Sequence, residues 1–509
     1  MSHVNFPKIA KNTLLLYVRM FLIMAVSLYT SRVILDTLGV SDYGIYMLVT
    51  GFISIFTFVS QTLVSSLQRF LNVAMGKGED GDSLCKVYIM GINIFIIFSL
   101  ILLLIGETVG LWLITHYLNI PVGREDAVFW VYQLSLVTMI IQLFRISDSA
   151  LIISHEKMSF YAYVSIFEAV LKLLAVFILK GSGFDKLIFY AWLYLAASVL
   201  INIIYRIYCR ITFSSCRYRF FWDKSLFRNM FSFSGWMIMS DGARTVSIQV
   251  ENIFLNNFYS VTANAARGIA SQVYNSINLF LVNFQTAFTP QLMKSYAAGE
   301  DSKHAQLLYK SSKFSYYLFL LLLIPVVSNL ESLLSIWLVD VPTYTREFCV
   351  YVLFAYLADA MAHPLYTSLR ANGNIRGAQL IISFGFIIQL IASYFLMRAG
   401  YPPYFVSVLI MISHIIHYFV YLFFCQKYAG LMIKDYLKLV ILPIVTTTIV
   451  AFILPIFLKS ESGNFLNTLI LFVVDACWVL FSIYIFGLSK TEKGYLSNAI
   501  ATKFSIKRK

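Results

Sequence analysis

Residues 262–285, TANAARGIASQVYNSINLFLVNFQ, have the length of a membrane-spanning helix, yet they include Arg267 and four asparagines. About 20 helical residues are enough to cross a hydrocarbon core roughly 30 Å thick. A charged or amide side chain is costly in that core, so it normally faces other helices or a water-filled cavity. The segment therefore predicts a membrane helix with one polar face turned towards the interior of a helix bundle.

The rest of the chain has the composition of a membrane protein. Of its 509 residues, 59% are hydrophobic and only 13% are charged, and the mean hydropathy is +0.77. A soluble domain is about half apolar and about a quarter charged. The apolar runs are continuous rather than alternating, which disfavours a membrane β-barrel. We expect an all-α polytopic membrane protein with about fourteen spans, near residues 12–35, 43–71, 84–106, 127–153, 159–180, 187–209, 229–257, 262–288, 305–329, 346–370, 375–397, 404–427, 433–458 and 464–487.

The formal net charge of +14 does not indicate a nucleic-acid partner, because basic residues collect in the cytoplasmic loops of membrane proteins. Lysines and arginines are concentrated in alternate connections between the predicted spans, and this bias places both termini in the cytoplasm. The six cysteines are scattered with no CxxC pair, so neither a disulfide framework nor a zinc site is expected. We expect no metal and no cofactor.

An internal repeat is indicated by two copies of Gly-Glu-Asp, at 78–80 and 299–301, which lie 221 residues apart. In the second predicted span, hydroxyl and amide side chains recur every three or four residues and so share one face of the helix. Three of them, Thr50, Ser54 and Thr57, lie 221 residues before Ser271, Asn275 and Asn278, which are polar residues of the segment 262–285.

The repeat predicts two lobes of six helices each, at residues 1–225 and 226–430, related by an axis along the membrane normal. Residues 431–509 then add two largely apolar, peripheral helices and a basic cytoplasmic tail. We expect the polar faces to line a central cavity between the lobes, with the first, second, seventh and eighth spans as its walls.

The side chains expected in that cavity suit a ligand with a phosphate and a glycan. Guanidinium groups present forked donors to phosphate and stay charged when partly desolvated. Hydroxyls and amides supply both the donors and the acceptors that sugar hydroxyls need. The predicted substrate-binding residues are Arg19, Arg244, Arg267, Asn264, Ser271, Asn275, Asn278, Thr50, Ser54, Thr57 and Gln61.

Acidic residues inside predicted spans are candidates for coupling transport to a proton or a cation. Two couples, Glu168 with Lys172 and Arg145 with Asp148, have spacings that favour pairing on one helix. For the similarly spaced Asp241 and Arg244, a local pair and a functional role both stay open. Inside the predicted spans the coupling candidates are Asp148, Glu168, Asp241, Glu251 and Asp359; Asp36, at the outer end of the first span, is a further candidate.

Arg19 and Arg267 differ from these couples, because neither has an acid within one turn of its own helix. Unpaired charge inside a membrane marks a substrate pathway, so we expect both guanidinium groups to face the substrate. Pairing across helices, with Glu251 or Asp241, is the alternative.

No motif for an enzyme is found. The chain has no G-x-x-x-x-G-K-[ST], no H-E-x-x-H and no G-x-S-x-G. GKGEDG at 76–81 matches G-x-G-x-x-G, but it follows a membrane helix and its acids would repel a pyrophosphate. His414 and His417 could ligate a metal by their spacing, but we expect a packed pair because no nearby carboxylate or cysteine supports a site.

The opening KNTLLLYVRMFLIMAVSLYTSRVILDTLGVSDYGIYMLVTGF, with LGVSDYGIY between the first two spans, resembles bacterial polysaccharide flippases of the Wzx type. These belong to the MOP superfamily, which also includes the lipid II flippases and the MATE multidrug exporters. AARGIASQVYNSI at 265–277, the GED loops and the fourteen-span count fit the same pattern. The resemblance covers nearly the whole chain, and it is weaker after about residue 430.

The resemblance implies a function. Such proteins move an oligosaccharide linked to undecaprenyl diphosphate across the bacterial inner membrane, for O-antigen, other lipopolysaccharide, capsule or exopolysaccharide synthesis. They use two lobes, alternating access and a cationic central cavity. Arg19 and Arg267 match family arginines that would hold the diphosphate, and Asp36 matches an acidic position in lipid II flippases. Membrane lipids and the polysaccharide polymerase machinery are the further partners expected.

Three alternatives stay open. A lipid II flippase is less well matched, because the middle of the second span has no arginine. A MATE-like cation or drug antiporter would prefer acidic and aromatic cavity walls and about twelve helices. A membrane enzyme that polymerises or ligates glycans would need a larger periplasmic loop than residues 106–126 supply.

Overall fold

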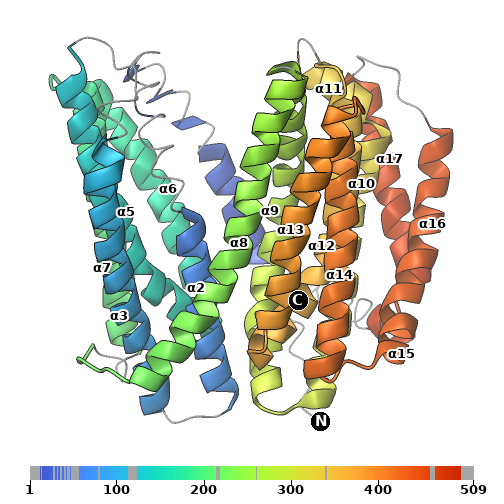
Figure 1. The fold of residues 1–509 in the computed structure, drawn as a ribbon, viewed down its shortest axis with the longest axis horizontal. Helices are drawn as coiled ribbons and strands as arrows, with labels where there is room; N and C mark the ends of the chain where they lie inside the picture. The colour runs from blue at the N-terminus through green and yellow to red at the C-terminus, as the bar shows by residue number, and fades with distance from the viewer. Residues whose placement is uncertain are drawn as a thin grey trace, which may run out of the picture. The chain divides into compact units, whose positions relative to one another are not determined.

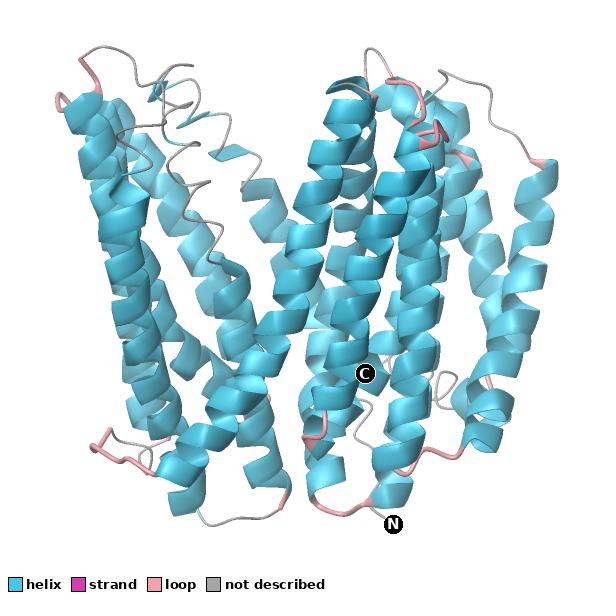
Figure 2. Ribbon diagram, in the orientation of Figure 1, coloured by secondary structure: helices cyan, strands magenta, loops and turns pink. Residues whose placement is uncertain are grey.

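The computed structural model describes residues 57–77, 81–112, 123–213, 218–259, 261–338, 341–458 and 465–494. It also describes scattered positions before residue 47: 12, 14–26, 29–30, 33–34, 37–38, 42 and 46. Figure 2 shows that the regular structure within these ranges is helical throughout. The predicted all-α fold class is confirmed.

The helices follow the chain in the order labelled in Figure 1. Three π-helical turns extend α3, α15 and α17 and are labelled η1 to η3. The elements are α2 (Thr57–Gly76), α3 (Gly81–Ile105), η1 (Gly106–Gly110), α5 (Glu125–Ser154), α6 (Met158–Lys180), α7 (Lys186–Thr212), α8 (Lys224–Phe258), α9 (Val261–Ala297), α10 (Asp301–Ser328), α11 (Leu330–Trp337), α12 (Thr345–Asn372), α13 (Arg376–Arg398), α14 (Phe405–Tyr428), α15 (Ile433–Tyr436), η2 (Leu437–Ile441), α16 (Leu442–Phe457), α17 (Phe465–Ser482) and η3 (Ile483–Gly487).

Within the described residues, ten helical segments are long and apolar enough to cross a membrane. They coincide with ten of the predicted spans. The spans predicted at 229–257 and 262–288 are α8 and α9, which are longer, at 35 and 37 residues, and more polar. The first two predicted spans are described only in part, by a helix at Leu14–Val26 and by α2.

Two features differ most from the prediction. The connection predicted at 289–304 is mostly helix, because α9 continues through Pro290 to Ala297. Leu292 and Met293, beyond the proline, are fully buried, and this packing outweighs the lost backbone hydrogen bond. A short helix, α11, follows α10 and was not predicted.

The chain forms two compact units. Unit 1 comprises residues 1–242 and 286–300, and unit 2 comprises residues 243–285 and 301–509. Helix α8 therefore passes from one unit to the other after Gly242, and α9 does so after Gln285. The predicted lobes at 1–225 and 226–430, and a cavity between them, stay predictions.

The helices of each unit pack in the same order. In unit 1, α5 lies against α3 and α7, and α6 lies against α7; in unit 2, α12 lies against α10 and α14, and α13 lies against α14. A thiol also meets a backbone carbonyl at corresponding places, with Cys209 Sγ 3.8 Å from Asp148 O and Cys425 Sγ 3.1 Å from Leu365 O. This correspondence agrees with the internal repeat. Cys209, Cys349, Cys425 and Cys477 are free, whereas Cys85 is disulfide-bonded, which the cysteine spacing did not predict.

Polar contacts tie α17 and the segment after η3 to α10 and to the residue that follows it, within unit 2. The carboxylate of Asp475, on α17, is buried and accepts hydrogen bonds from Ser328 Oγ at 2.6 Å and Asn329 Nδ2 at 2.9 Å. Beyond η3, Glu492 Oε2 lies 2.7 Å from Lys313 Nζ. Asp475 thus serves as an anchor between helices, although the sequence predicted a largely apolar, peripheral pair.

Gly76, the last residue of α2, lies against the C-terminal end of α9 in unit 1. A Cβ at this position would lie 2.6 Å from Ala297 Cβ and 2.8 Å from Lys294 Cα. Because the obstacle is largely backbone, we expect Gly76→Ala to cost about 1–3 kcal/mol of stability, measured as a lower melting temperature of the purified protein. Gly81→Ala is the control, since its Cβ would meet nothing within 4 Å. Equal melting temperatures for the two variants would contradict this packing.

Candidate functional site

Three cations and one carboxylate gather inside the membrane helices of unit 1. Arg145 Nη1, on α5, lies 2.7 Å from Glu168 Oε2, on α6. Lys172 Nζ, one turn further along α6, lies 2.9 Å from Glu168 Oε1. Arg19, on the helix at Leu14–Val26, is the third cation. We call Arg19, Arg145, Lys172 and Glu168 the cation cluster.

Each cation of this cluster lies over a tyrosine ring. The distances to the ring centroids are 4.6 Å for Arg19 over Tyr161, 5.6 Å for Arg145 over Tyr205 and 4.9 Å for Lys172 over Tyr194. Tyr161 and Glu168 are seven residues apart on α6 and so share one face of this helix, which places Arg19, over the Tyr161 ring, on the face that carries Glu168. The ring faces stabilise positive charge without neutralising it.

The cation cluster carries an excess of positive charge. Among its members, one carboxylate faces three cations, and the side chains of Arg145, Glu168 and Lys172 keep 24%, 18% and 29% of their surface exposed. The Nε of Arg19 is buried with no hydrogen-bond partner. An anion reaching these side chains would meet forked N–H donors in partly desolvated surroundings, where charge-assisted hydrogen bonds are strong.

The predicted ion pair of Arg145 with Asp148 is wrong, although Glu168 does pair with Lys172 as predicted. Asp148 is fully buried between α3, α5 and α7; it accepts a hydrogen bond from Tyr88 and lies 3.4 Å from Arg206 Nη1. The i, i+3 spacing allowed a local contact, but packing turns Arg145 towards α6 and Asp148 towards α7.

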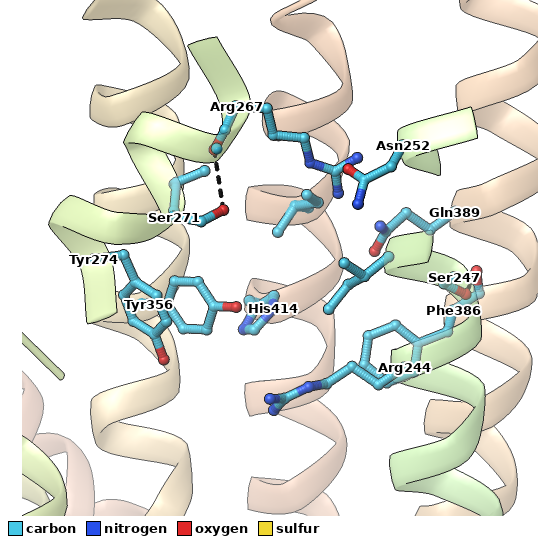
Figure 3. Close-up of a pocket in the computed structure, with 14 residues that line it drawn as sticks. Arg244, Ser247, Asn252, Arg267, Ser271, Tyr274, Tyr356, Phe386, Gln389 and His414 are labelled. Atoms are coloured by element: carbon cyan, nitrogen blue, oxygen red, sulfur yellow. Dashed lines mark hydrogen bonds between the residues drawn. The ribbon is translucent and has the colours of Figure 1, made fainter. Parts of the chain in front are cut away.

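Unit 2 contains a cavity of about 410 Å³ between α8, α9, α12, α13 and α14. Figure 3 shows polar and aromatic side chains converging on it. We call it the unit 2 cavity. Its polar lining includes Arg244, Ser247, Asn252, Arg267, Ser271 and Gln389, and its aromatic lining includes Tyr274, Tyr356, Phe386 and His414.

A buried ion pair forms one end of the unit 2 cavity. Arg267 Nη2 lies 2.6 Å from Glu251 Oε2, and Glu251 is completely buried. The other carboxylate oxygen of Glu251 accepts hydrogen bonds from Gln389 Nε2 at 2.9 Å and Ser393 Oγ at 3.0 Å. The cross-helix partner that the sequence left as the alternative for Arg267 is therefore present.

Two of the three side chains that hold Glu251 keep one polar atom without a partner. Arg267 Nη1 and Gln389 Oε1 are buried and make no hydrogen bond. In Figure 3 the guanidinium of Arg267 and the amides of Asn252 and Gln389 lie close together, at the end of the view away from Arg244. One donor and one acceptor are therefore left unsatisfied at this end of the cavity.

Aromatic rings form another wall of the cavity. Tyr274 and Tyr356 stack with their ring centroids 3.5 Å apart and their planes 13° from parallel. His414 meets Tyr356 edge-on at 4.9 Å, and its Nδ1 lies 3.7 Å from Asp359 Oδ1. The expectation that no carboxylate lies near His414 and His417 is wrong, because Asp359 reaches His414 from the neighbouring helix. The described residues contain no group of three or more potential metal ligands.

The predicted substrate-binding residues fall into three groups. Arg244, Arg267 and Ser271 line the unit 2 cavity, and Arg19 belongs to the cation cluster. Asn275 and Asn278 lie further along α9 and are outside the cavity lining. Thr50 and Ser54, and the side chains of Thr57, Gln61 and Asn264, lie outside the described structure.

Most of the predicted coupling acids already have partners. Glu168 and Glu251 are in ion pairs, Asp148 is held by Tyr88 and Arg206, and Asp359 lies beside His414. Asp241 Oδ2 accepts a hydrogen bond from Thr62 Oγ1 at 2.7 Å. Asp36 lies outside the described residues.

Sequence reasoning missed the tyrosines of both sites and the functional potential of Arg145, Lys172 and Gln389. Arg145 and Lys172 were assigned to local ion pairs. The chain has 33 tyrosines, and nothing in their spacing marks the few that lie beneath a cation or along a cavity.

The fold matches known transporter structures. No family model matches the sequence, and no curated protein matches it. An outward-facing MATE multidrug resistance transporter of the MOP superfamily superposes with a TM-score of 0.68 at 10% identity, over 83% of this chain and 96% of its own. A MATE protein in a straight conformation gives 0.66 at 12% identity, over the same shares of the two chains. A MOP superfamily transporter from Pyrococcus furiosus, described as having a binding pocket of reverse polarity, gives 0.64 at 12% identity over 84% and 96%. These similarities establish that the chain has the MATE-like fold of a polytopic membrane protein.

Proposed function

We propose that this protein is a transporter that moves a lipid-linked oligosaccharide with a diphosphate headgroup across the membrane. The observation that carries the proposal is the excess positive charge of the cation cluster within membrane helices. Charge inside a membrane is costly unless it is paired or hydrated. A diphosphate entering this site would supply the missing negative charge, and the guanidinium forks of Arg19 and Arg145 suit its oxygens.

The protein would move the lipid-linked oligosaccharide by shielding its polar headgroup from the hydrocarbon core. The lipid tail can stay in the bilayer, while the diphosphate and the sugars cannot cross hydrocarbon unaided. Arginines, tyrosines and amides of the protein would replace the hydration shell of the headgroup. The MATE-like fold supports alternating access, in which the site opens to one side of the membrane at a time. With no nucleotide-binding motif in the sequence, the energy would come from an ion gradient or from consumption of the product.

A cation or drug antiporter is the second candidate, and the solved structures of similar fold favour it. The tyrosine-lined unit 2 cavity, with Glu251 and Asp359 nearby, resembles the acidic and aromatic wall that a cationic drug requires. Glu251, however, is paired with Arg267, and Arg244 lies near Asp359 and offsets its charge. The unit 2 cavity therefore lacks the net negative charge that would attract a cation.

A proteoliposome assay separates the two candidates. Purified protein is reconstituted with an undecaprenyl-diphosphate oligosaccharide that carries a fluorophore on its glycan, and a membrane-impermeant quencher reports which leaflet it occupies. We expect the protein to move the fluorescent lipid between leaflets, and to leave ethidium undisturbed when a proton or sodium gradient is imposed. Gradient-driven ethidium transport without movement of the lipid would refute the flippase and support the antiporter. A parallel arm with fluorescent lipid II tests the remaining alternative.

The bacterial inner membrane, the cytoplasmic termini and a partner in the polymerase machinery are further parts of this proposal. They rest on the lysine and arginine bias and on the sequence resemblance.

A further inference from the structure

We propose that the unit 2 cavity binds one acetamido sugar of the transported glycan, with the acetamido group between Arg267 and Gln389 and the sugar ring against Tyr356. The proposal rests on the proposed function for the class of cargo. It assigns the cavity a task separate from that of the cation cluster, namely recognition of the glycan rather than of the diphosphate.

The unpartnered atoms define the chemistry of the ligand. Arg267 is only 5% exposed and Gln389 only 6%, yet Arg267 Nη1 and Gln389 Oε1 make no hydrogen bond. Both side chains are fixed by the same carboxylate of Glu251, so neither atom can turn away without breaking a short contact. Buried polar groups nearly always have partners. A secondary amide satisfies both atoms at once, because its C=O accepts from the guanidinium and its N–H donates to the glutamine carbonyl.

The charge at this end of the cavity favours a neutral ligand. The negative charge of Glu251 balances the positive charge of Arg267. Gln389 and Ser393 donate the further hydrogen bonds that the carboxylate accepts. Arg244, which is exposed, lies away from Arg267 in Figure 3. A phosphate or carboxylate placed beside Arg267 would therefore face the charge of Glu251 within the same pair. An amide brings no charge and avoids this repulsion.

The aromatic wall and the volume fit a sugar. A sugar ring presents C–H groups on its faces, which pack well against an aromatic ring, and its edges carry hydroxyls. The Tyr274–Tyr356 stack, braced edge-on by His414, supplies a rigid aromatic surface. Small-ligand sites occupy about 300–1,000 Å³, so a cavity of about 410 Å³ suits a monosaccharide or disaccharide unit.

Direct binding tests the subsite without transport. The full-length protein in lipid nanodiscs is titrated by calorimetry with N,N′-diacetylchitobiose and with cellobiose, which has hydroxyls in place of both acetamido groups. We expect chitobiose to bind at least tenfold more tightly. Tyr356→Leu should weaken chitobiose binding by at least tenfold, and Tyr356→Phe, which keeps the ring, should weaken it less than Tyr356→Leu does. Tyr484→Leu, at a half-exposed tyrosine of η3, is the matched control and should bind normally too.

The outcomes separate this proposal from the proposed function. Equal binding of the two disaccharides, no binding of either, or normal chitobiose binding by a correctly folded Tyr356→Leu protein would overturn the subsite, even if the lipid-linked glycan is transported. If chitobiose is preferred while the proteoliposomes move no lipid-linked glycan, the subsite stands and the proposed cargo is wrong. Melting temperatures identify a variant that has failed to fold, and Gln389→Met then provides the second test: it should lose the preference for chitobiose over cellobiose.

Discussion

Glu251→Gln is expected to destabilise the protein by about 3–5 kcal/mol, the usual cost of removing one partner of a buried ion pair. Glu251 is completely buried, and the Arg267 side chain is only 7% exposed. The substitution keeps the shape of the side chain but leaves the guanidinium without its counter-charge in a low-dielectric site. The measurement is the melting temperature of the purified protein, together with the fraction that stays monodisperse after heating.

A matched pair and a double variant give this prediction its controls. Glu331 and Arg346 form an exposed ion pair of similar length, 3.0 Å, with side chains 71% and 60% exposed. Exposed pairs contribute little, so Glu331→Gln should leave the melting temperature unchanged. The double variant Glu251→Leu/Arg267→Leu should recover most of the lost stability, because it removes both buried charges together. If Glu251→Gln melts like the Glu331→Gln control, Arg267 does not depend on Glu251 for its charge balance.

The membrane helices could be predicted from the sequence because each apolar run has the length of one span and ends at polar or turn-forming residues. The predicted span 159–180, for example, matches α6 within one residue at its start and at its end. The ends of α9 were harder to predict, since its polar C-terminal turns after Pro290 are stabilised by contacts within unit 1 rather than by the bilayer.

Pairing between helices could not be predicted from spacing along one helix. Arg145 had Asp148 one turn away, yet it pairs with Glu168 on α6, while Asp148 contacts Tyr88 and Arg206. The spacing of residues along the sequence shows which side chains share one face of a helix. It does not show how the helix is rotated about its own axis, and that rotation decides which neighbouring helix a charged side chain faces. For the same reason, the polar face of α9 was predicted as one surface, but of the described residues predicted on that face only Arg267 and Ser271 line the unit 2 cavity.

Arg19→Ala and Arg145→Ala are each expected to slow movement of the lipid-linked oligosaccharide by roughly 10- to 100-fold. A hydrogen bond to a charged group contributes about 1.5–3 kcal/mol, and each 1.4 kcal/mol corresponds to about tenfold. The proteoliposome quenching assay measures the rate. Arg145→Lys should be intermediate, because lysine keeps the charge but loses the fork. Arg228→Ala, at an exposed arginine of α8, is the matched control and should move the lipid at the normal rate.

Glu168→Gln distinguishes a substrate site from a structural ion-pair network, because the two hypotheses predict opposite changes. If the cation cluster binds the diphosphate, the substitution removes its one carboxylate and increases the positive charge that faces the substrate. The lipid-linked oligosaccharide should then bind more tightly, and its release should become slower. If Arg145 and Lys172 serve only to hold α5 and α6 together, removing Glu168 weakens the packing, and both binding and stability should fall. Affinity for the diphosphate lipid, measured beside the melting temperature, decides between them, and an unchanged affinity in a protein of unchanged stability would remove the cation cluster from the transport site.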